Sequence, residues 1–295
     1  MYELIALSEH DFYIDCPAKI GLSKISETDV VAIDSGSDKD GGKKVLKHIE
    51  SNGWHLAAIY ATHSHADHIG GCRLLQDRTG CKVYAAGLEA AFTKDPILEP
   101  MTLYGGNPFA DLRHKFLLAQ ACSVEELTPE VLPKGWEMIP LPGHSFDMVG
   151  FKTADGNIFL ADCVSSTETL QKYGIGYLWD VEKSLATLET VKTLKAPAFI
   201  PAHAPVVSSI EALCDENAAS INGACETVLK ILEEPKSFDD LLAGVFDAYG
   251  LTMNAQQFVL IGSTVRSILS YLLEKGQVGF SFEENRMLWK AKESA

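Results

Sequence analysis

The chain has 295 residues, of which 46% are apolar and 22% charged, and its formal net charge is −15. These values are ordinary for a folded protein and exclude disorder as the main state. The negative charge argues against nucleic acid or an anionic membrane as a general partner, because both attract positive surfaces. The seven cysteines form no Cys-x-x-Cys pair. No run of about 18 apolar residues and no signal peptide is evident, so we expect a cytoplasmic protein with no membrane span.

The first two hundred residues alternate short apolar runs with helical patterns. Strands are predicted at 30–33, 56–60, 82–85, 136–139, 158–160 and 198–200, and helices at 43–50, 69–78 and 181–194. Strands and helices that alternate over this length predict an α/β domain with a covered sheet.

After about residue 208 the pattern becomes mainly helical. Helices are predicted at 211–232, 238–249 and 256–275. Ser237 is the expected N-cap of the second helix, and Gly276 ends the third. Alternating apolar residues then predict a hairpin over 278–290. The chain is therefore expected to divide into a domain at 1–208 and a smaller region at 209–295.

A dense group of polar residues directly follows the apolar strand at 56–60: His63, His65, Asp67 and His68. Imidazole and carboxylate are ligands that suit zinc and similar divalent ions. In an extended segment His63 and His65 point the same way. Asp67 and His68 stand where the chain turns into a helix at Gly70–Gly71. This spacing offers ligands to two neighbouring points.

Three further candidate ligands each follow an apolar run, namely His144, Asp162 and His203. Because open α/β sheets place functional groups in loops beyond the strand ends, we expect these side chains near the first group. A single histidine in such a position is more often a satisfied surface or core group. The complete set favours a metal site.

The segment from His63 to His68 resembles the His-x-His-x-Asp-His signature of the metallo-β-lactamase superfamily. Asp34, His144, Asp162 and His203 match the remaining motifs in order, and the resemblance covers roughly residues 1–210. It implies a four-layer αββα sandwich with two divalent metal ions at one edge of the paired sheets. Zinc is expected, with iron or manganese as alternatives. The implied ligand sets are His63, His65 and His144 at one metal and Asp67, His68 and His203 at the other, with Asp162 bridging.

Two such ions share a hydroxide that can attack an electrophilic carbonyl or phosphorus. Asp67 is the expected catalytic residue, because it can ligate a metal and handle the proton of the hydroxide. Asp34 is expected to orient the histidine loop, although an Asp before Ser-Gly also suits a turn. The predicted activity is hydrolysis of a small-molecule ester, thioester or lactone. The alternatives are an endoribonuclease or phosphodiesterase of the same superfamily, a mononuclear-iron persulfide dioxygenase, and a non-catalytic metal-binding protein.

At three positions the sequence differs from the motifs of particular enzyme groups in the superfamily, and these differences argue against some activities. True zinc β-lactamases typically lack the bridging aspartate, so Asp162 argues against antibiotic hydrolysis. His65 stands where flavodiiron oxygen reductases carry glutamate. Ser64 stands where glyoxalase II enzymes usually show an additional histidine.

The C-terminal region resembles the winged-helix tail of β-lactamase-like hydrolases that include endoribonucleases. Its acidic residues outnumber its basic ones. The predicted third helix carries only Arg266 and Lys275, and the hairpin turn contains Glu283 and Glu284. Phosphates would be repelled there. We therefore expect an element that packs, dimerises or forms a pocket, and no nucleic-acid partner.

The segment 95–120 is too long and too apolar for a plain connection between strands. Tyr104, Arg113 and His114 are its candidate substrate-pocket residues, since they offer aromatic surface and local positive charge. The segment is predicted to cover the metal cleft as a lid or pocket wall, with Gly105–Gly106 as its hinge. The alternative is a subunit contact in a homodimer or a static surface patch.

Overall fold

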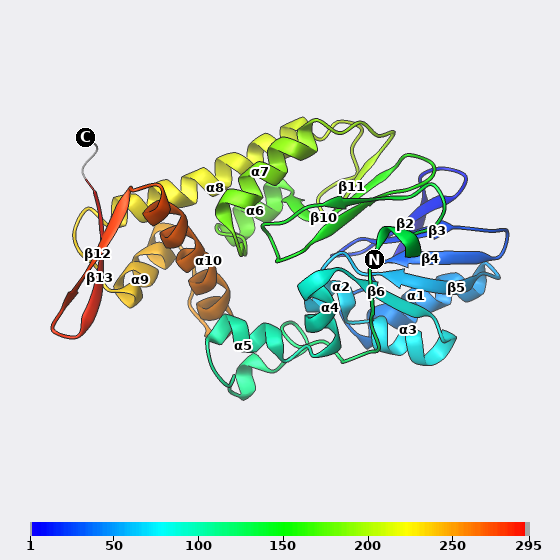
Figure 1. The fold of residues 1–295 in the computed structure, drawn as a ribbon, viewed down its shortest axis with the longest axis horizontal. Helices are drawn as coiled ribbons and strands as arrows, with labels where there is room; N and C mark the ends of the chain where they lie inside the picture. The colour runs from blue at the N-terminus through cyan, green and yellow to red at the C-terminus, as the bar shows by residue number, and fades with distance from the viewer. Residues whose placement is uncertain (1, 293–295) are drawn as a thin grey trace.

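Two β-sheets face each other at the centre of the fold, and helices cover their outer faces (Figure 1). The computed structural model describes residues 2–292. Separate apolar cores fill the three spaces between these layers: one between each sheet and its helices, and one between the sheets. The predicted α/β class and four-layer αββα sandwich are confirmed.

The first sheet holds seven strands in chain order, antiparallel from β1 to β4 and parallel from β4 to β7. They are β1 (Glu3–Ala6), β2 (Asp11–Asp15), β3 (Ile20–Lys24), β4 (Asp29–Ile33), β5 (His55–Tyr60), β6 (Lys82–Ala85) and β7 (Glu125–Glu126). Its outer face is covered by α1 (Lys39–Ser51), α2 (Ala66–Ile69) and α3 (Cys72–Thr79).

The second sheet has the order β11–β10–β9–β8, with β10 and β11 parallel and the other pairs antiparallel. Its strands are β8 (Glu137–Pro140), β9 (Val149–Lys152), β10 (Ile158–Ser165) and β11 (Phe199–His203). The helix α7 (Val181–Lys192) and the first half of α8 (Glu211–Ile231) pack on its outer face.

The strand β4 shows why its sequence is continuously apolar. Val30 and Ala32 belong to the core beneath the helices, whereas Val31 and Ile33 belong to the core between the sheets. Successive side chains of a strand point to opposite faces, so a strand that is covered on both sides needs apolar residues throughout.

The helix predicted over 69–78 is α3, which begins only at Cys72, and Gly70–Gly71 separate it from the short helix α2 that carries Asp67 and His68. A Cβ atom on either glycine would collide with a carbonyl oxygen, that of Ser37 for Gly70 and that of Ser35 for Gly71. The glycines thus let the Asp67–His68 turn pack directly against the loop that follows β4.

The strand predicted at 158–160 extends to Ser165, so Asp162 lies within β10 rather than after it. Ala161 has a φ of +49°, and the pairing of β10 with β11 is irregular at this point. The irregularity comes directly before Asp162. His203, in contrast, is the last residue of β11, close to the predicted position at the strand end.

The C-terminal region consists of the second half of α8, then α9 (Phe238–Ala248), α10 (Ala255–Glu274) and a hairpin of β12 (Val278–Glu283) and β13 (Arg286–Ala291). These elements share their own apolar core. The Ser237 side chain accepts a hydrogen bond from the backbone N–H of Asp240, so the predicted N-cap is confirmed. Because α8 belongs to two cores, it joins the regions on either side of the predicted boundary at 208–209. The winged-helix assignment stays a prediction.

Three short helices connect the main layers, α4 (Gly87–Lys94), α5 (Leu98–Tyr104) and α6 (Thr167–Tyr173), and a 3₁₀ turn lies at Ala110–Leu112. A second 3₁₀ turn lies at Pro129–Val131. In the segment 95–120, Leu103, Leu112 and Leu117 pack against Val259 of α10. Across the described residues, no helix is both long and apolar enough to span a bilayer.

Candidate metal centre

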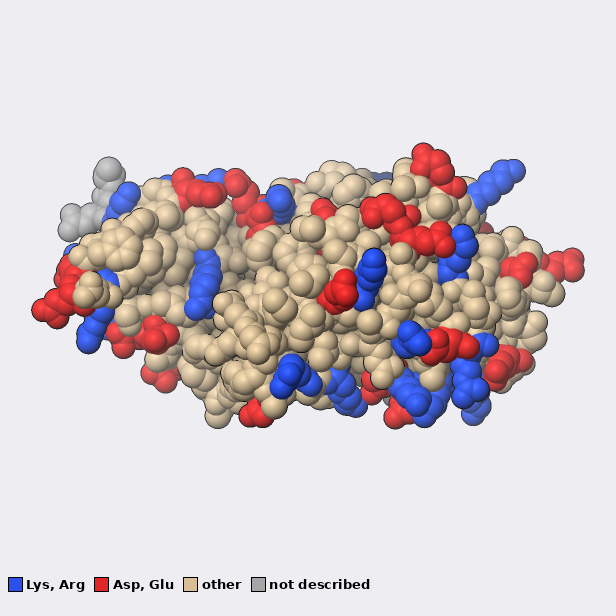
Figure 2. Space-filling view, turned by 60° about the horizontal axis from the view of Figure 1, so that its bottom comes forward, with Lys and Arg blue, Asp and Glu red and all other residues tan. Residues whose placement is uncertain are grey.

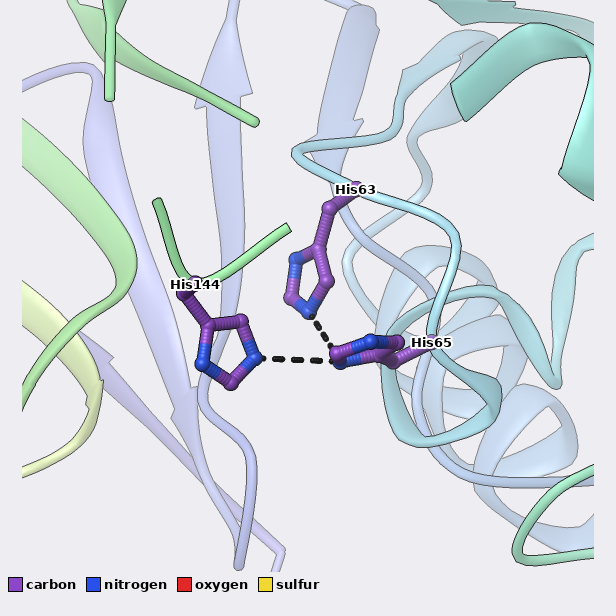
Figure 3. A group of neighbouring side chains, drawn as sticks. All are labelled: His63, His65 and His144. Carbon is purple, nitrogen blue, oxygen red and sulfur yellow. Dashed lines mark hydrogen bonds between the residues drawn. The ribbon is translucent and has the colours of Figure 1, made fainter. Parts of the chain in front are cut away.

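Three histidine nitrogens converge at one point between the loop after β5 and the loop after β8 (Figure 3). His65 Nδ1 lies 3.0 Å from His63 Nε2 and 3.0 Å from His144 Nε2. His63 is fully buried. Three imidazoles arranged in this way could hold one metal ion.

A second group lies beside the first and contains Asp67, His68, Asp162 and His203. His203 Nε2 is 3.3 Å from Asp67 and 3.2 Å from Asp162. Asp162 also approaches the first group, at 3.5 Å from His144 Nε2 and 4.0 Å from His63 Nε2. The structure therefore brings together all seven predicted residues, hereafter the seven-residue cluster, with Asp162 between the two groups.

Two atoms of the cluster are buried without a hydrogen-bond partner among the described residues: His68 Nε2 and Asp162 Oδ1. They lie 3.1 Å apart but are not aligned to form a hydrogen bond. Buried polar atoms are almost always paired, and an orphaned nitrogen and oxygen that face the same point fit a shared cation. The donor set of this cluster therefore fits a divalent metal ion.

Protein acceptors hold the other ring nitrogen of three histidines. His68 Nδ1 lies 2.7 Å from Asp34 Oδ2, and His203 Nδ1 lies 2.8 Å from the Pro17 carbonyl oxygen. His63 Nδ1 lies 3.0 Å from Thr62 Oγ1. These hydrogen bonds hold a proton on Nδ1 and turn each Nε2 towards the cluster, where a metal ion could bind it.

As expected from the sequence, Asp34 contacts the histidine loop, and it binds the ring nitrogen of His68 that points away from the cluster. Its carboxylate accepts hydrogen bonds from the Thr62 backbone N–H at 2.8 Å and the Thr62 hydroxyl at 2.9 Å. Its φ of +65° lies in the left-handed region, which Asp and Asn tolerate better than most residues.

Burial and neighbouring charges divide the histidines into two classes. Burial holds the pKa of His63 well below its usual range and lowers the pKa values of His65 and His144 to about 4. Burial also opposes a charge on His68 and His203, but the carboxylates of Asp162 and Asp67 outweigh it. The pKa of His68 is therefore raised well above its usual range and that of His203 to about 10. The second group favours positive charge, which is what a divalent cation supplies.

Asp67 is the most accessible carboxylate of the cluster. Its side chain is 42% exposed, whereas that of Asp162 is 9% exposed. A proton can therefore reach or leave Asp67 from solvent more readily than Asp162.

Sequence analysis missed Glu89, a fully buried residue of α4. One carboxylate oxygen of Glu89 accepts hydrogen bonds from the Ser64 backbone at 2.8 Å and from the Ser64 hydroxyl at 2.6 Å. The other oxygen accepts from the Ser145 hydroxyl at 2.6 Å and the Asp147 backbone at 3.1 Å. Glu89 thus ties the His63–His65 loop to the loop of His144. No sequence pattern marks it, because these partners come from distant segments.

Two further residues near the cluster were also missed, Tyr177 and Glu99. The Tyr177 ring centroid lies 5.1 Å from that of His65 and 5.6 Å from that of His144. Glu99 of α5 is 8% exposed. Burial first, then the Asp67 and Glu89 carboxylates, raise its pKa well above its usual range.

The predicted pocket residues of the segment 95–120 are Tyr104, Arg113 and His114. Tyr104 is 44% exposed and packs edge-to-face on Phe109. Arg113 and His114 line an outer groove that also contains Asp38, and within the described residues no member of the seven-residue cluster lines that groove. Glu99, not these three, is the residue of this segment whose pKa is affected by a carboxylate of the cluster, that of Asp67. A role for Tyr104, Arg113 and His114 in substrate binding stays a prediction.

Known proteins resemble the chain in sequence and in fold. The family model described as Metallo-beta-lactamase superfamily matches residues 22–203. A hydroxyacylglutathione hydrolase from Bradyrhizobium sp. (strain ORS 278) is 29% identical over 147 residues, which cover 49% of each chain. One from Albidiferax ferrireducens is 25% identical over 180 residues, or 60% of each chain. The chain thus spans about half the length of the first of these relatives and 60% of the second.

Two solved structures extend the likeness to the C-terminal region. A metallo-beta-lactamase family protein from Thermus thermophilus superposes with a TM-score of 0.71 at 15% identity, over 99% of this chain and 98% of that one. A beta-lactamase domain protein from Burkholderia ambifaria gives a TM-score of 0.72 at 15% identity, over 98% and 94%. These matches show a shared fold. Because the family model covers more than half of the chain, the protein belongs to the metallo-β-lactamase superfamily.

Proposed function

We propose that this protein is a binuclear metallohydrolase that cleaves a small ester, thioester or lactone. The observation that carries the proposal is the buried pair His68 Nε2 and Asp162 Oδ1, which lie 3.1 Å apart without a hydrogen bond inside a cluster of seven candidate ligands. One ion would be held by His63, His65 and His144 and the other by Asp67, His68 and His203, with Asp162 between them. Zinc fits this donor set, and iron and manganese are the alternatives.

Two bound divalent ions supply a hydroxide at neutral pH and polarise a substrate carbonyl. The residues of the chain would orient the metal ligands and transfer a proton to the leaving group. Asp67, as the exposed carboxylate, would accept the proton of the attacking water and pass it towards the leaving group. Asp34 and Thr62 would keep His68 and His63 in the tautomer that presents Nε2.

A carbonyl substrate is favoured over a phosphodiester by two features. The similar hydroxyacylglutathione hydrolases carry a name that denotes hydrolysis of an acyl thioester. The basic side chains at α10 also have partners already, because Arg266 within the helix stacks on Phe238 at 3.7 Å and Lys275 at its C-cap pairs with Glu182 at 2.7 Å. Figure 2 shows acidic and basic side chains interspersed at the left end, where the hairpin lies. We therefore propose a small-molecule substrate and no nucleic-acid partner.

We also place the protein in a reducing compartment such as the cytoplasm. All seven cysteines are free thiols, and five of them are buried. Buried thiols that form no disulfide suit a compartment in which thiols stay reduced.

A hydrolase panel with metal-loaded protein tests the proposed function. Protein loaded separately with zinc, iron and manganese is assayed on aryl esters, acyl thioesters, lactones, a phosphodiester, single-stranded RNA and a persulfide. We expect turnover of a carboxylic ester, thioester or lactone that His203→Ala abolishes. His55→Ala, which removes an exposed histidine of β5, should leave it unchanged. Turnover confined to the phosphodiester, RNA or persulfide would contradict the proposal.

A further inference from the structure

An internal cavity adjoins the seven-residue cluster where the C-terminal helices meet the sandwich. It encloses about 110 Å³, and His144 and Asp162 form part of its wall. The rest of the wall comes from the loop between β8 and β9, from β10, from the segment 175–178 and from helices α6, α7, α8 and α10. In Figure 1 these helices lie between the sheets and the C-terminal hairpin.

The wall of the cavity is apolar away from the cluster. Its apolar residues include Leu141, Met148, Leu170, Ile175, Ile221 and Ile268. Among the described residues, no Lys, Arg or Glu lines it. A charged group placed deep in this cavity would therefore lose its hydration without finding a partner.

Four polar side chains of the wall are already bonded to the backbone, namely those of Thr187, Ser184, Asn217 and Thr264. Thr187 donates to the Pro142 carbonyl at 2.7 Å and Ser184 to the Asp180 carbonyl at 2.8 Å. Asn217 bonds to both backbone groups of Ser165, at 2.9 and 2.8 Å. Because these groups are satisfied within the protein, they have little capacity left to recognise a polar ligand.

A groove on the His203 side of the cluster is lined in part by charged residues, in contrast to the apolar cavity. It encloses about 540 Å³, and its lining includes Asp15, Lys19 and Glu168 together with His203. A substrate that reacts at the cluster therefore meets an apolar cavity at one end and a charged groove at the other.

We propose that the cavity is the acyl subsite, which binds the apolar chain of the substrate while the polar leaving group lies in the His203 groove. This inference rests on the proposed hydrolase function and adds the class of substrate, one with a short apolar acyl group. An apolar cavity of about 150 Å³ holds a benzene ring, so this one accommodates roughly four carbons beyond the carbonyl.

Binding of linear carboxylates, the expected acyl products, tests the subsite without any turnover. Acetate, propanoate, butanoate, pentanoate and octanoate are titrated into metal-loaded protein by calorimetry. Affinity should rise by about threefold to fourfold per methylene up to pentanoate and rise no further at octanoate. Equal affinity for acetate and pentanoate, or no binding of either, would overturn the inference.

A matched pair of variants on α8 locates the binding site. Ser220 lines the cavity, whereas the neighbouring Ala219 is exposed. Ser220→Leu should weaken pentanoate binding at least tenfold and leave acetate within twofold, and Ala219→Leu should change neither. If Ser220→Leu keeps full chain-length discrimination, the chain binds elsewhere and the inference is wrong.

The two proposals fail in different ways. Chain-length discrimination by carboxylates without hydrolysis of any ester, thioester or lactone would reject the proposed function and leave the apolar subsite in place. Hydrolysis with the same kcat/KM for acetyl and pentanoyl esters would reject the subsite alone.

Discussion

At the scale of single residues, the site depends on which nitrogen of each histidine carries the proton. The Asp34 carboxylate, 2.7 Å from His68 Nδ1, fixes that choice for a ring whose Nε2 has no other partner among the described residues. Outer hydrogen bonds of this kind set the orientation and basicity of metal ligands. We therefore propose that Asp34 positions His68 and is not itself a ligand.

We predict that Asp34→Asn lowers metal affinity by about 10-fold to 100-fold. Asparagine tolerates the φ of +65° and can still accept from Thr62, but its amide nitrogen cannot accept the His68 proton. Asp29→Asn is the matched control, because Asp29 pairs with the exposed His55 at 3.0 Å. Competition with a chromogenic chelator measures both variants, and equal affinities would show that Asp34 has no positioning role.

The raised pKa values of His68 and His203 predict that metal binding releases protons. With its pKa raised to about 10, His203 carries a proton at pH 7 and loses it only as the pH rises through that value. The pKa of His68 is raised in the same direction. Binding of metal to these nitrogens should thus release about two protons at pH 7, in addition to any from a bound water. Zinc titrations in buffers of different ionisation enthalpy measure this number, and a value near zero would be inconsistent with these charge states.

At the scale of elements, α4 connects two ligand loops through one side chain. Glu89 accepts four hydrogen bonds, two from the loop of His63 and two from that of His144. We therefore expect the geometry of the first group of candidate ligands to depend on this carboxylate.

Glu89→Gln should reduce kcat and metal affinity by about tenfold or more while the protein stays folded. The amide group has the same shape but one acceptor atom, so at least one loop loses its partner. Glu50→Gln, an exposed change on α1, serves as the control, and circular dichroism checks the fold. Unchanged kcat together with full metal content in Glu89→Gln would refute the positioning role.

Some elements could be predicted from sequence and others could not. β4 and β5 are buried on both faces and carry continuous apolar runs, so their positions were predicted closely. β2 combines terminal aspartates with partly buried residues, and α5 has only seven residues with Pro100 inside. Such elements are stabilised by tertiary packing rather than by a local pattern, which explains why they were missed.

The same distinction applies to the site. All seven residues of the cluster were identified from their positions after apolar strands and from the family signature. Glu89, Glu99 and Tyr177 were not, because each reaches the cluster from a segment without a metal-ligand pattern. The irregular pairing at Ala161, directly before Asp162, is likewise set by packing between β10 and β11.

At the scale of the whole molecule, the C-terminal region completes the sandwich. The first half of α8 covers the second sheet, and its second half belongs to the core of α9 and α10. Removing it would expose both cores to water.

A chain that ends after residue 208 should therefore be insoluble or should unfold at a markedly lower temperature than the full chain. A chain that ends after Gly276 keeps α8 to α10 and should retain a cooperative transition. Solubility and thermal unfolding compare the two. A soluble, cooperatively folded 1–208 fragment would show that the sandwich is independent of α8.

If the proposed function is right, the seven-residue cluster holds two metal ions. Elemental analysis of the full chain, after saturation in turn with zinc, iron and manganese and removal of the excess, tests it most directly. We predict about two ions per chain with at least one of these metals, and one or none in Asp162→Ala. A parent protein that takes up a single ion with every metal would contradict the binuclear site.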